Sequence, residues 1–227
     1  MRLLLIRHGQ TQPNADEVID TRIPGPPLTA LGTRQAAALP EALAQVLAGE
    51  DLGALWVSSM LRTHQTAAPL ARAHGLSPVE RHGLHEIQAP HWELSGDPAH
   101  LDAYYDVVLS WAHGQLQRPM PGGETGEEFF ARYDAVVDEA VRAARAAGQD
   151  TVAVVGHGTA IRCWSARRAD NLDAATLERR PLENTGVVVL QATPQGARPW
   201  TCRTWMGAPP SGIGAHAPAG PAGAPLA

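Results

Sequence analysis

Lysine is absent from this 227-residue chain, so all 18 of its basic residues are arginines. Without lysine the protein cannot form a Schiff base with a carbonyl substrate, hold pyridoxal phosphate through a lysine, or use the lysine of a P-loop. Arginine keeps its charge, and its planar guanidinium group is suited to paired hydrogen bonds with phosphate oxygens. The abundance of Ala, Gly, Pro and Arg points to genomic base composition as the origin of the bias, and the exclusion holds in either case.

Cysteines and long apolar runs are also scarce. Cys163 and Cys202 are the only two cysteines, and they have neither metal-ligand spacing nor the number needed for a disulfide framework. No run approaches the roughly 20 apolar residues of a membrane helix. Residues 3–6 are too few for the apolar region of a signal peptide, and Arg7 follows them directly. These features predict a cytoplasmic protein with free thiols and no membrane partner.

The net charge of −5 and a hydrophobic fraction of 44% are typical of a soluble globular protein. An acidic balance argues against nucleic acid as the main partner, because a phosphate backbone requires a basic face. Residues 1–206 are long enough to form one domain with a large core. Residues 207–227 are almost entirely Gly, Ala and Pro, and we expect them to form a flexible tail.

Short apolar runs alternate with segments of helical period, which predicts a three-layer α/β/α fold around a mainly parallel sheet. The expected helices include residues 28–47, with Thr29 as the N-cap, and residues 125–147, where Thr125 and Glu128 form a capping box. A third helix is expected at residues 62–74. Residues 93–120 do not follow this alternation of strands and helices, and they are expected to form a helical lid over the carboxyl edge of the sheet. The expected strands are residues 3–6, 55–57, 151–155 and 186–190.

Three of these strands end in polar groups. Arg7 and His8 follow the first strand, Arg62 comes shortly after the second, and His157 follows the third. Because ligands bind beyond the carboxyl ends of parallel strands, we expect these side chains to converge. A neutral imidazole is a competent nucleophile near pH 7, and guanidinium groups bind phosphoryl oxygens. The pattern therefore points to phosphoryl transfer, which depends mainly on positioning and on neutralising charge.

A metal site is the main alternative, since histidine is the commonest metal ligand. No Asp or Cys lies at ligand spacing beside His8 or His157, and the two arginines would repel a cation. We therefore expect neither a metal nor another cofactor.

Five ordered motifs resemble those of the histidine phosphatase superfamily, also called phosphoglycerate-mutase-like. The resemblance covers residues 2 to about 190 and favours the phosphatase branch. The matching blocks are residues 5–11 with Asn14, residues 27–36, residues 58–67, residues 84–86, and residues 122–125 followed by 154–158.

The resemblance implies a role for each matching residue. His8 would be the nucleophile that becomes phosphohistidine. Glu86 would protonate the leaving oxygen and then deprotonate the attacking water, with Glu93 and Glu124 as the rival acids. The groups expected to bind the phosphate are Arg7, Arg62 and His157, together with Gln10, Thr11 and Asn14.

Departures from the family pattern concern substrate recognition. Pro90 and Leu94 stand where glycines are common after the acid, which predicts a remodelled loop. The expected lid carries three aspartates, Asp97, Asp102 and Asp106, and Arg118 is its only arginine. A mutase must hold a second acidic group, so this balance favours a phosphatase. The aromatic residues near the lid suggest an apolar or aromatic leaving group or, equally, packing of the lid; they are Trp92, Tyr104, Tyr105 and Trp111.

The sequence thus predicts a metal-independent hydrolase that acts on a small phosphorylated metabolite through phosphohistidine. Two alternatives remain: a cofactor-dependent phosphoglycerate mutase, and an inactive binding module of the same fold. The second is disfavoured because the nucleophile, acid and clamp residues are all retained. A homodimer is left open.

Overall fold

The computed structural model describes residues 1–193 and 196–207 of the chain. Residues 208–227, which make up nearly all of the expected tail, lie outside the described residues. Within the described part, no helix combines the length and apolar character needed to cross a membrane.

A six-stranded sheet forms the centre of the molecule, in the order β3-β2-β4-β1-β5-β6. The first four strands of this order are parallel neighbours, while β5 pairs antiparallel with β1 and β6 pairs antiparallel with β5. The mainly parallel sheet is therefore confirmed. The strands are β1 (Arg2–Arg7), β2 (Ala54–Ser58), β3 (Val79–Arg81), β4 (Thr151–Gly156), β5 (Val187–Ala192) and β6 (Trp200–Trp205).

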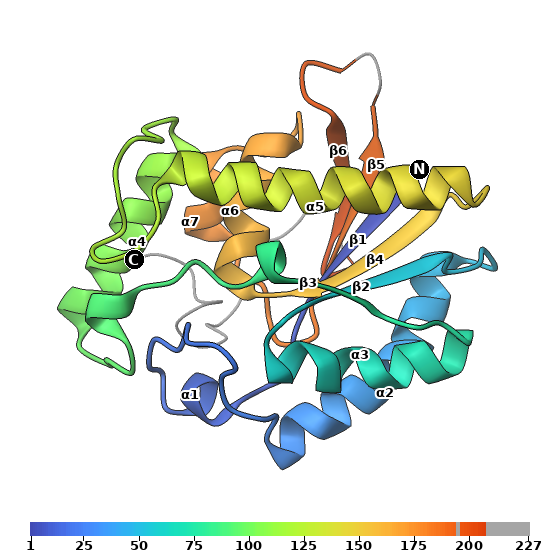
Figure 1. Ribbon diagram of the computed structural model, residues 1–227, viewed down its shortest axis with the longest axis horizontal. Coiled ribbons are helices and arrows are strands. Elements are labelled where there is room, and N and C mark those ends of the chain that lie inside the picture. The colour runs from blue at the N-terminus through green and yellow to red at the C-terminus, as the bar shows by residue number, and fades with distance from the viewer. Residues whose placement is uncertain (194–195, 208–227) are drawn as a thin grey trace.

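Helices cover both faces of this sheet, as Figure 1 shows. The side chains of β1 alternate between two apolar clusters: Leu4 and Ile6 pack on the side of α2 and α3, and Leu3 and Leu5 on the side of α4, α5 and α6. The three-layer architecture is thereby confirmed. The helices are α1 (Gln12–Ala15), α2 (Ala30–Leu47), α3 (Leu61–His74), α4 (Pro98–Ala112), α5 (Gly126–Ala146), α6 (Gly158–Arg168) and α7 (Ala174–Arg179), with 3-10 turns at His82–Leu84 and Pro90–Trp92.

The cap signals in the sequence correctly marked two helix starts. Thr29 Oγ1 accepts from the Gly32 N–H at 3.0 Å, and Thr125 and Glu128 form the expected capping box. The strands β3 and β6 were not predicted. β3 has only three residues and none is buried, while β6 alternates buried and more exposed positions, so neither produces an apolar run.

Close packing behind β1 fixes the loop that carries His8. A Cβ on Gly9 would lie 2.6 Å from the Gly32 carbonyl oxygen, and one on Gly32 would lie 2.1 Å from that of Gln10. Both positions therefore require glycine. Gly9 thus lets the first turn of α2 approach the loop that carries His8.

Candidate active site

His8 follows β1 directly and is 3% exposed. Its Nδ1 lies 2.7 Å from the Gly9 carbonyl oxygen. A carbonyl can only accept, so in the neutral ring Nδ1 carries the proton and Nε2 keeps its lone pair. Burial, together with the charges of Arg62 and Arg7, holds the pKa of His8 well below its ordinary value. The ring is therefore neutral near pH 7 and can act as a nucleophile through Nε2.

Two arginines lie beside this ring. Arg7 is fully buried, and its Nη1 donates to the Leu182 carbonyl oxygen at 2.6 Å. Burial lowers the pKa of Arg7 to about 10, so the group stays charged at neutral pH. Arg62, from the first turn of α3, is 2% exposed and lines the same pocket as His8. Arg7, the other residue expected to bind phosphate, is not among the described residues that line this pocket.

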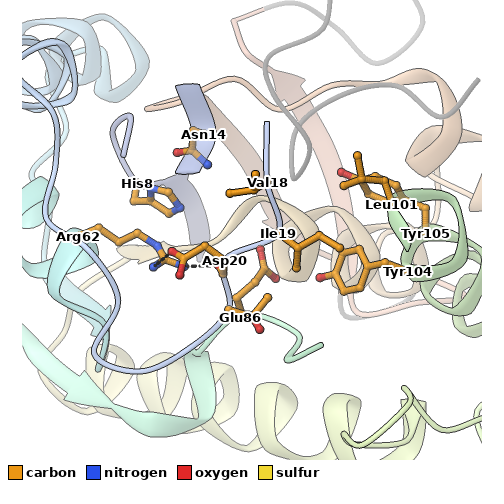
Figure 2. A pocket seen from close by; sticks show the side chains of 11 residues that line it. His8, Asn14, Val18, Ile19, Asp20, Arg62, Glu86, Leu101, Tyr104 and Tyr105 are labelled. Carbon is orange, nitrogen blue, oxygen red and sulfur yellow. Dashed lines mark hydrogen bonds and ion pairs between the residues drawn. The ribbon is translucent and has the colours of Figure 1, made fainter. Parts of the chain in front are cut away.

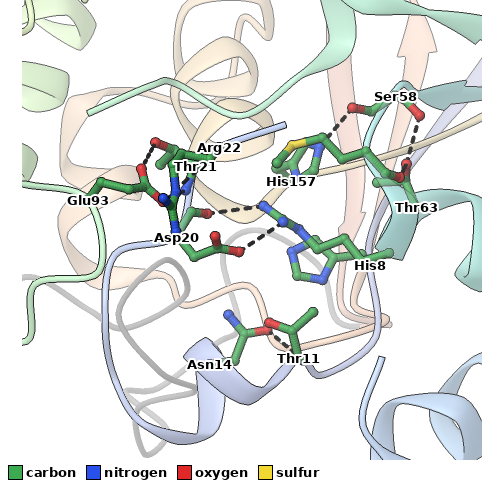
Figure 3. Close-up of polar contacts among 12 residues, drawn as sticks. His8, Thr11, Asn14, Asp20, Thr21, Arg22, Ser58, Thr63, Glu93 and His157 are labelled. Atoms are coloured by element: carbon green, nitrogen blue, oxygen red, sulfur yellow. Dashed lines mark hydrogen bonds and ion pairs between the residues drawn. The ribbon is translucent and has the colours of Figure 1, made fainter. Parts of the chain in front are cut away.

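Arg62 is held by a residue that the sequence did not suggest. Its Nη1 donates to Asp20 Oδ2 at 2.9 Å, and its Nη2 donates to the Asp20 carbonyl oxygen at 3.1 Å. Figure 3 draws both bonds as dashed lines that end at Asp20, and Figure 2 labels Arg62 beside Asp20. Burial raises the pKa of Asp20, against the opposing charge of Arg62. This acidic residue lies 12 positions after His8 in a loop, and no local spacing relates it to Arg62.

His157 is the N-cap residue of α6 and is fully buried. Its Nε2 lies 2.9 Å from Ser58 Oγ at the end of β2, and its ring centroid is 5.3 Å from that of His8. Burial, with the charges of Arg62 and His8, lowers the pKa of His157 well below its ordinary value. The two strand-end histidines therefore lie side by side as neutral rings.

Glu86 supplies the cap that His157 does not. Its Oε2 accepts from the Thr159 N–H at 3.0 Å, and its Oε1 accepts from the Ala160 N–H at 2.8 Å and from the Ile87 N–H at 2.9 Å. These bonds fix the carboxyl group at the N-terminus of α6. Burial nevertheless raises the pKa of Glu86, outweighing the three N–H groups and Arg62. A buried carboxyl group that retains its proton more readily is suited to general acid catalysis.

The structure gives different surroundings to the three remaining residues that were expected to bind phosphate. Asn14 lines the pocket, and its Oδ1 accepts from the Thr11 N–H at 3.1 Å and from Asn184 Nδ2 at 3.2 Å. Thr11 is 1% exposed and caps the short helix α1. Gln10 is not among the described residues that line the pocket, and its Oε1 accepts from Thr29 Oγ1 at 2.9 Å.

The pocket beside His8 joins a polar side to an apolar one (Figure 2). Trp92 and Trp111 are not among the residues described as lining it: Trp92 stacks on His100, and Trp111 on Phe129. The polar side holds His8, Asn14, Asp20, Thr21, Arg62 and Glu86. The apolar side, here named the leaving-group wall, consists of Val18, Ile19, Leu101, Tyr104 and Tyr105.

The rival acids are engaged outside the pocket. Glu93 accepts from the Thr21 N–H at 2.9 Å and from Thr21 Oγ1 at 2.6 Å. Glu124 pairs with Arg132 of α5, at 2.6 Å and 2.7 Å. Arg132 Nη1 also donates to the carbonyl oxygens of Gly83 and His85, so this pair supports the segment that leads into Glu86.

The remodelled acid loop is compatible with this placement. Leu94 has a φ of 60°, a left-handed conformation that favours glycine. Its N–H donates to the Ile19 carbonyl oxygen at 2.7 Å, so the loop stays attached to the segment bearing Asp20.

Within residues 1–193 and 196–207, no three His, Cys, Asp or Glu side chains are grouped to hold a metal ion.

Known proteins match this chain over most of its length. The model of the histidine phosphatase superfamily (branch 1) matches residues 3–206. A solved structure of a mycobacterial glucosyl-3-phosphoglycerate phosphatase, in complex with VO3, superposes with a TM-score of 0.72 at 26% identity. The match covers 90% of this chain and 98% of that one.

Two related sequences differ in their names and lengths. The PE-PGRS family protein PE_PGRS11 of Mycobacterium tuberculosis (strain ATCC 25618 / H37Rv) is 35% identical over 216 residues. That match covers 90% of this chain but 36% of PE_PGRS11, so the chain spans about a third of that relative. A probable phosphoglycerate mutase GpmB of Klebsiella pneumoniae (strain 342) is 29% identical over 212 residues, covering 90% of this chain and 92% of the mutase.

Proposed function

Because the chain belongs to the histidine phosphatase superfamily, we propose that it hydrolyses small phosphate monoesters through a phosphohistidine formed on His8. The observation that carries the proposal is the state of His8: a buried neutral ring whose Nδ1 is bound to the Gly9 carbonyl oxygen. Its Nε2 lone pair lies in a pocket shared with a cationic group, Arg62, and an acid, Glu86.

In the first half-reaction, Nε2 of His8 attacks phosphorus as the ester P–O bond breaks. Glu86 donates its proton to the departing oxygen, while Arg7 and Arg62 bind the phosphoryl oxygens. Nδ1 of His157 has no hydrogen-bond partner among the described residues, which leaves it available to donate to the same oxygens. The products of this step are a free alcohol, phospho-His8 and an ionised Glu86.

In the second half-reaction, water attacks phosphorus and the N–P bond breaks. Glu86 takes one proton from the water, so the carboxyl group returns to its starting state. Inorganic phosphate leaves and His8 is again neutral, with its Nδ1 proton still bound to Gly9. No step needs a cofactor. We further propose that residues 1–206 act as one catalytic domain and that residues 93–120, which include α4, act as its lid.

A mutase is the second candidate, since a related sequence is a probable phosphoglycerate mutase. Both activities begin with phospho-His8, and they differ in whether the phosphoryl group reaches water or a second hydroxyl group. Phosphate release from a panel of phosphomonoesters, assayed with a chelator beside 3-phosphoglycerate isomerisation, separates them. Release without isomerisation supports the phosphatase, and isomerisation without net release overturns it in favour of the mutase.

A silent panel is resolved by trapping. His8→Ala should lose both turnover and the acid-labile phosphoprotein that the wild type forms with a ³²P-labelled ester. A wild-type protein that never becomes phosphorylated would contradict the proposal and favour a binding module.

A further inference from the structure

Asp20 places a carboxylate inside the pocket, beside the cation that is proposed to bind the phosphate. Its side chain is 6% exposed, and both terminal nitrogens of Arg62 donate to this one residue, at 2.9 Å and 3.1 Å. Figure 2 shows Asp20 between Arg62 and Glu86, with its carboxylate turned toward Arg62. The positive charge of Arg62 is therefore partly offset by Asp20 before a substrate arrives.

The leaving-group wall offers no compensating cation. Its five residues are uncharged, and Arg62 is the only arginine among the described residues that line the pocket. Arg22 is 64% exposed and pairs with Glu93 at 3.5 Å. Arg162 lies beside the wall, with its guanidinium carbon 6.0 Å from the Tyr105 ring, but it does not line the pocket and its Nη2 donates to the Leu177 carbonyl oxygen.

We infer that Asp20 makes the enzyme select phosphate esters whose leaving group is uncharged and apolar or aromatic, and reject esters that carry a second negative charge. This inference rests on the proposed phosphatase function and names its substrate class. A carboxylate on the leaving group would meet the Asp20 carboxylate in a partly desolvated site, where like charges repel strongly. An uncharged aromatic group would instead bury its surface against the tyrosines of the wall.

Two aryl phosphates of nearly equal shape test the charge directly: 4-carbamoylphenyl phosphate and 4-carboxyphenyl phosphate. The ratio of their kcat/KM values at pH 8 is measured for the wild type and for Asp20→Asn. Asparagine keeps the size of the side chain and an oxygen that can accept from Arg62. Asp102→Asn is the matched control, because it removes the same charge from an exposed position on α4, next to the wall residue Leu101.

We expect the wild type to favour the carbamoyl ester by about tenfold or more, and Asp20→Asn to reduce that ratio by at least about fivefold. Asp102→Asn should keep the wild-type ratio. Intrinsic differences between the two phenols cancel, because the same pair is compared in every variant. Circular dichroism and Tm confirm that the variants are folded.

The outcomes separate this inference from the proposed function. Hydrolysis of both esters with the same ratio in wild type and Asp20→Asn overturns the role of Asp20 and leaves the phosphatase standing. A wild-type preference for the carboxylate ester also overturns it, and would assign the selection to Arg162 or Arg22; this readout needs no variant. If the wild type forms no phospho-His8 with any ester, the proposed function itself fails.

Discussion

Replacing Glu86 with glutamine tests the role of the acid through its dependence on the leaving group. The carboxyl group is proposed to protonate the departing oxygen. Its loss should therefore lower kcat more for an ester whose leaving group is a weaker acid. Benzyl alcohol is a far weaker acid than 4-nitrophenol, so benzyl phosphate depends on the acid and 4-nitrophenyl phosphate hardly does. For benzyl phosphate we expect Glu86→Gln to lower kcat by roughly 10²- to 10⁴-fold, the usual contribution of a positioned acid or base.

The second half-reaction predicts a distinct signature with the activated ester. Glu86 is also the proposed base for water attack, so the variant should phosphorylate His8 rapidly and then lose the phosphoryl group slowly. Stopped-flow absorbance should show a burst of 4-nitrophenolate close to one equivalent per active site, followed by slow turnover. Equal losses on both esters without a burst would refute the assignment, and near-normal turnover of benzyl phosphate would mean that another group is the acid.

The contacts of Glu86 set a stability cost that must be separated from the chemistry. The two carboxylate oxygens accept three backbone N–H groups, including that of Thr159 on Oε2. Glutamine has one acceptor oxygen, so an NH₂ group would face at least one of these donors. Leaving one buried N–H without an acceptor costs about 1–3 kcal/mol. A lower Tm with the burst retained is the expected combination, and it shows that the variant is folded when assayed.

Two further predictions concern the groups around the site. The His8 ring should stay neutral as pH falls through 6.5, because burial, Arg62 and Arg7 disfavour its charged form and lower its pKa; side-chain ¹⁵N shifts that titrate near 6.5 would contradict this. Arg132→Gln should destabilise the protein by about 3 kcal/mol by leaving the partly buried Glu124 unpaired, and should lower kcat for benzyl phosphate. Arg81→Gln, which breaks an exposed pair, should cost little stability and leave kcat unchanged, as chemical denaturation and steady-state assays can show.

The convergence of the strand-end residues could be predicted because it depends on local signals and one topological rule. Apolar runs mark β1, β2 and β4, and parallel neighbours end at the same edge of the sheet. That rule alone brings His8 to His157. The reversal of β5 had no such signal, because an apolar run does not encode strand direction. The register and direction of that strand follow from how the chain returns after α7.

Asp20 and Arg132 could not be found in this way, because each acts across a large sequence separation. Asp20 meets Arg62 from 42 positions away, and Arg132 reaches the Gly83 carbonyl oxygen from 49 positions away. Both lie in segments whose own patterns are ordinary: Asp20 in a loop, and Arg132 at a half-buried position of an amphipathic helix. The resemblance to a known family indicated a role for Glu86 but not for Asp20 or Arg132.

The position of Glu86 shows why the proposed catalytic acid cannot be found from local sequence spacing. Its segment is tied to α5 through Arg132, and its carboxyl group closes the N-terminus of α6, the helix that begins immediately after His157. Because Glu86 supplies the cap, the N-cap residue His157 is spared that task and its ring is left to bond Ser58 beside the nucleophile. The same interaction thus holds the acid and frees the second histidine. A shorter acid such as aspartate at position 86 would weaken the cap and withdraw the proton donor together, so stability and turnover should fall in parallel at this position.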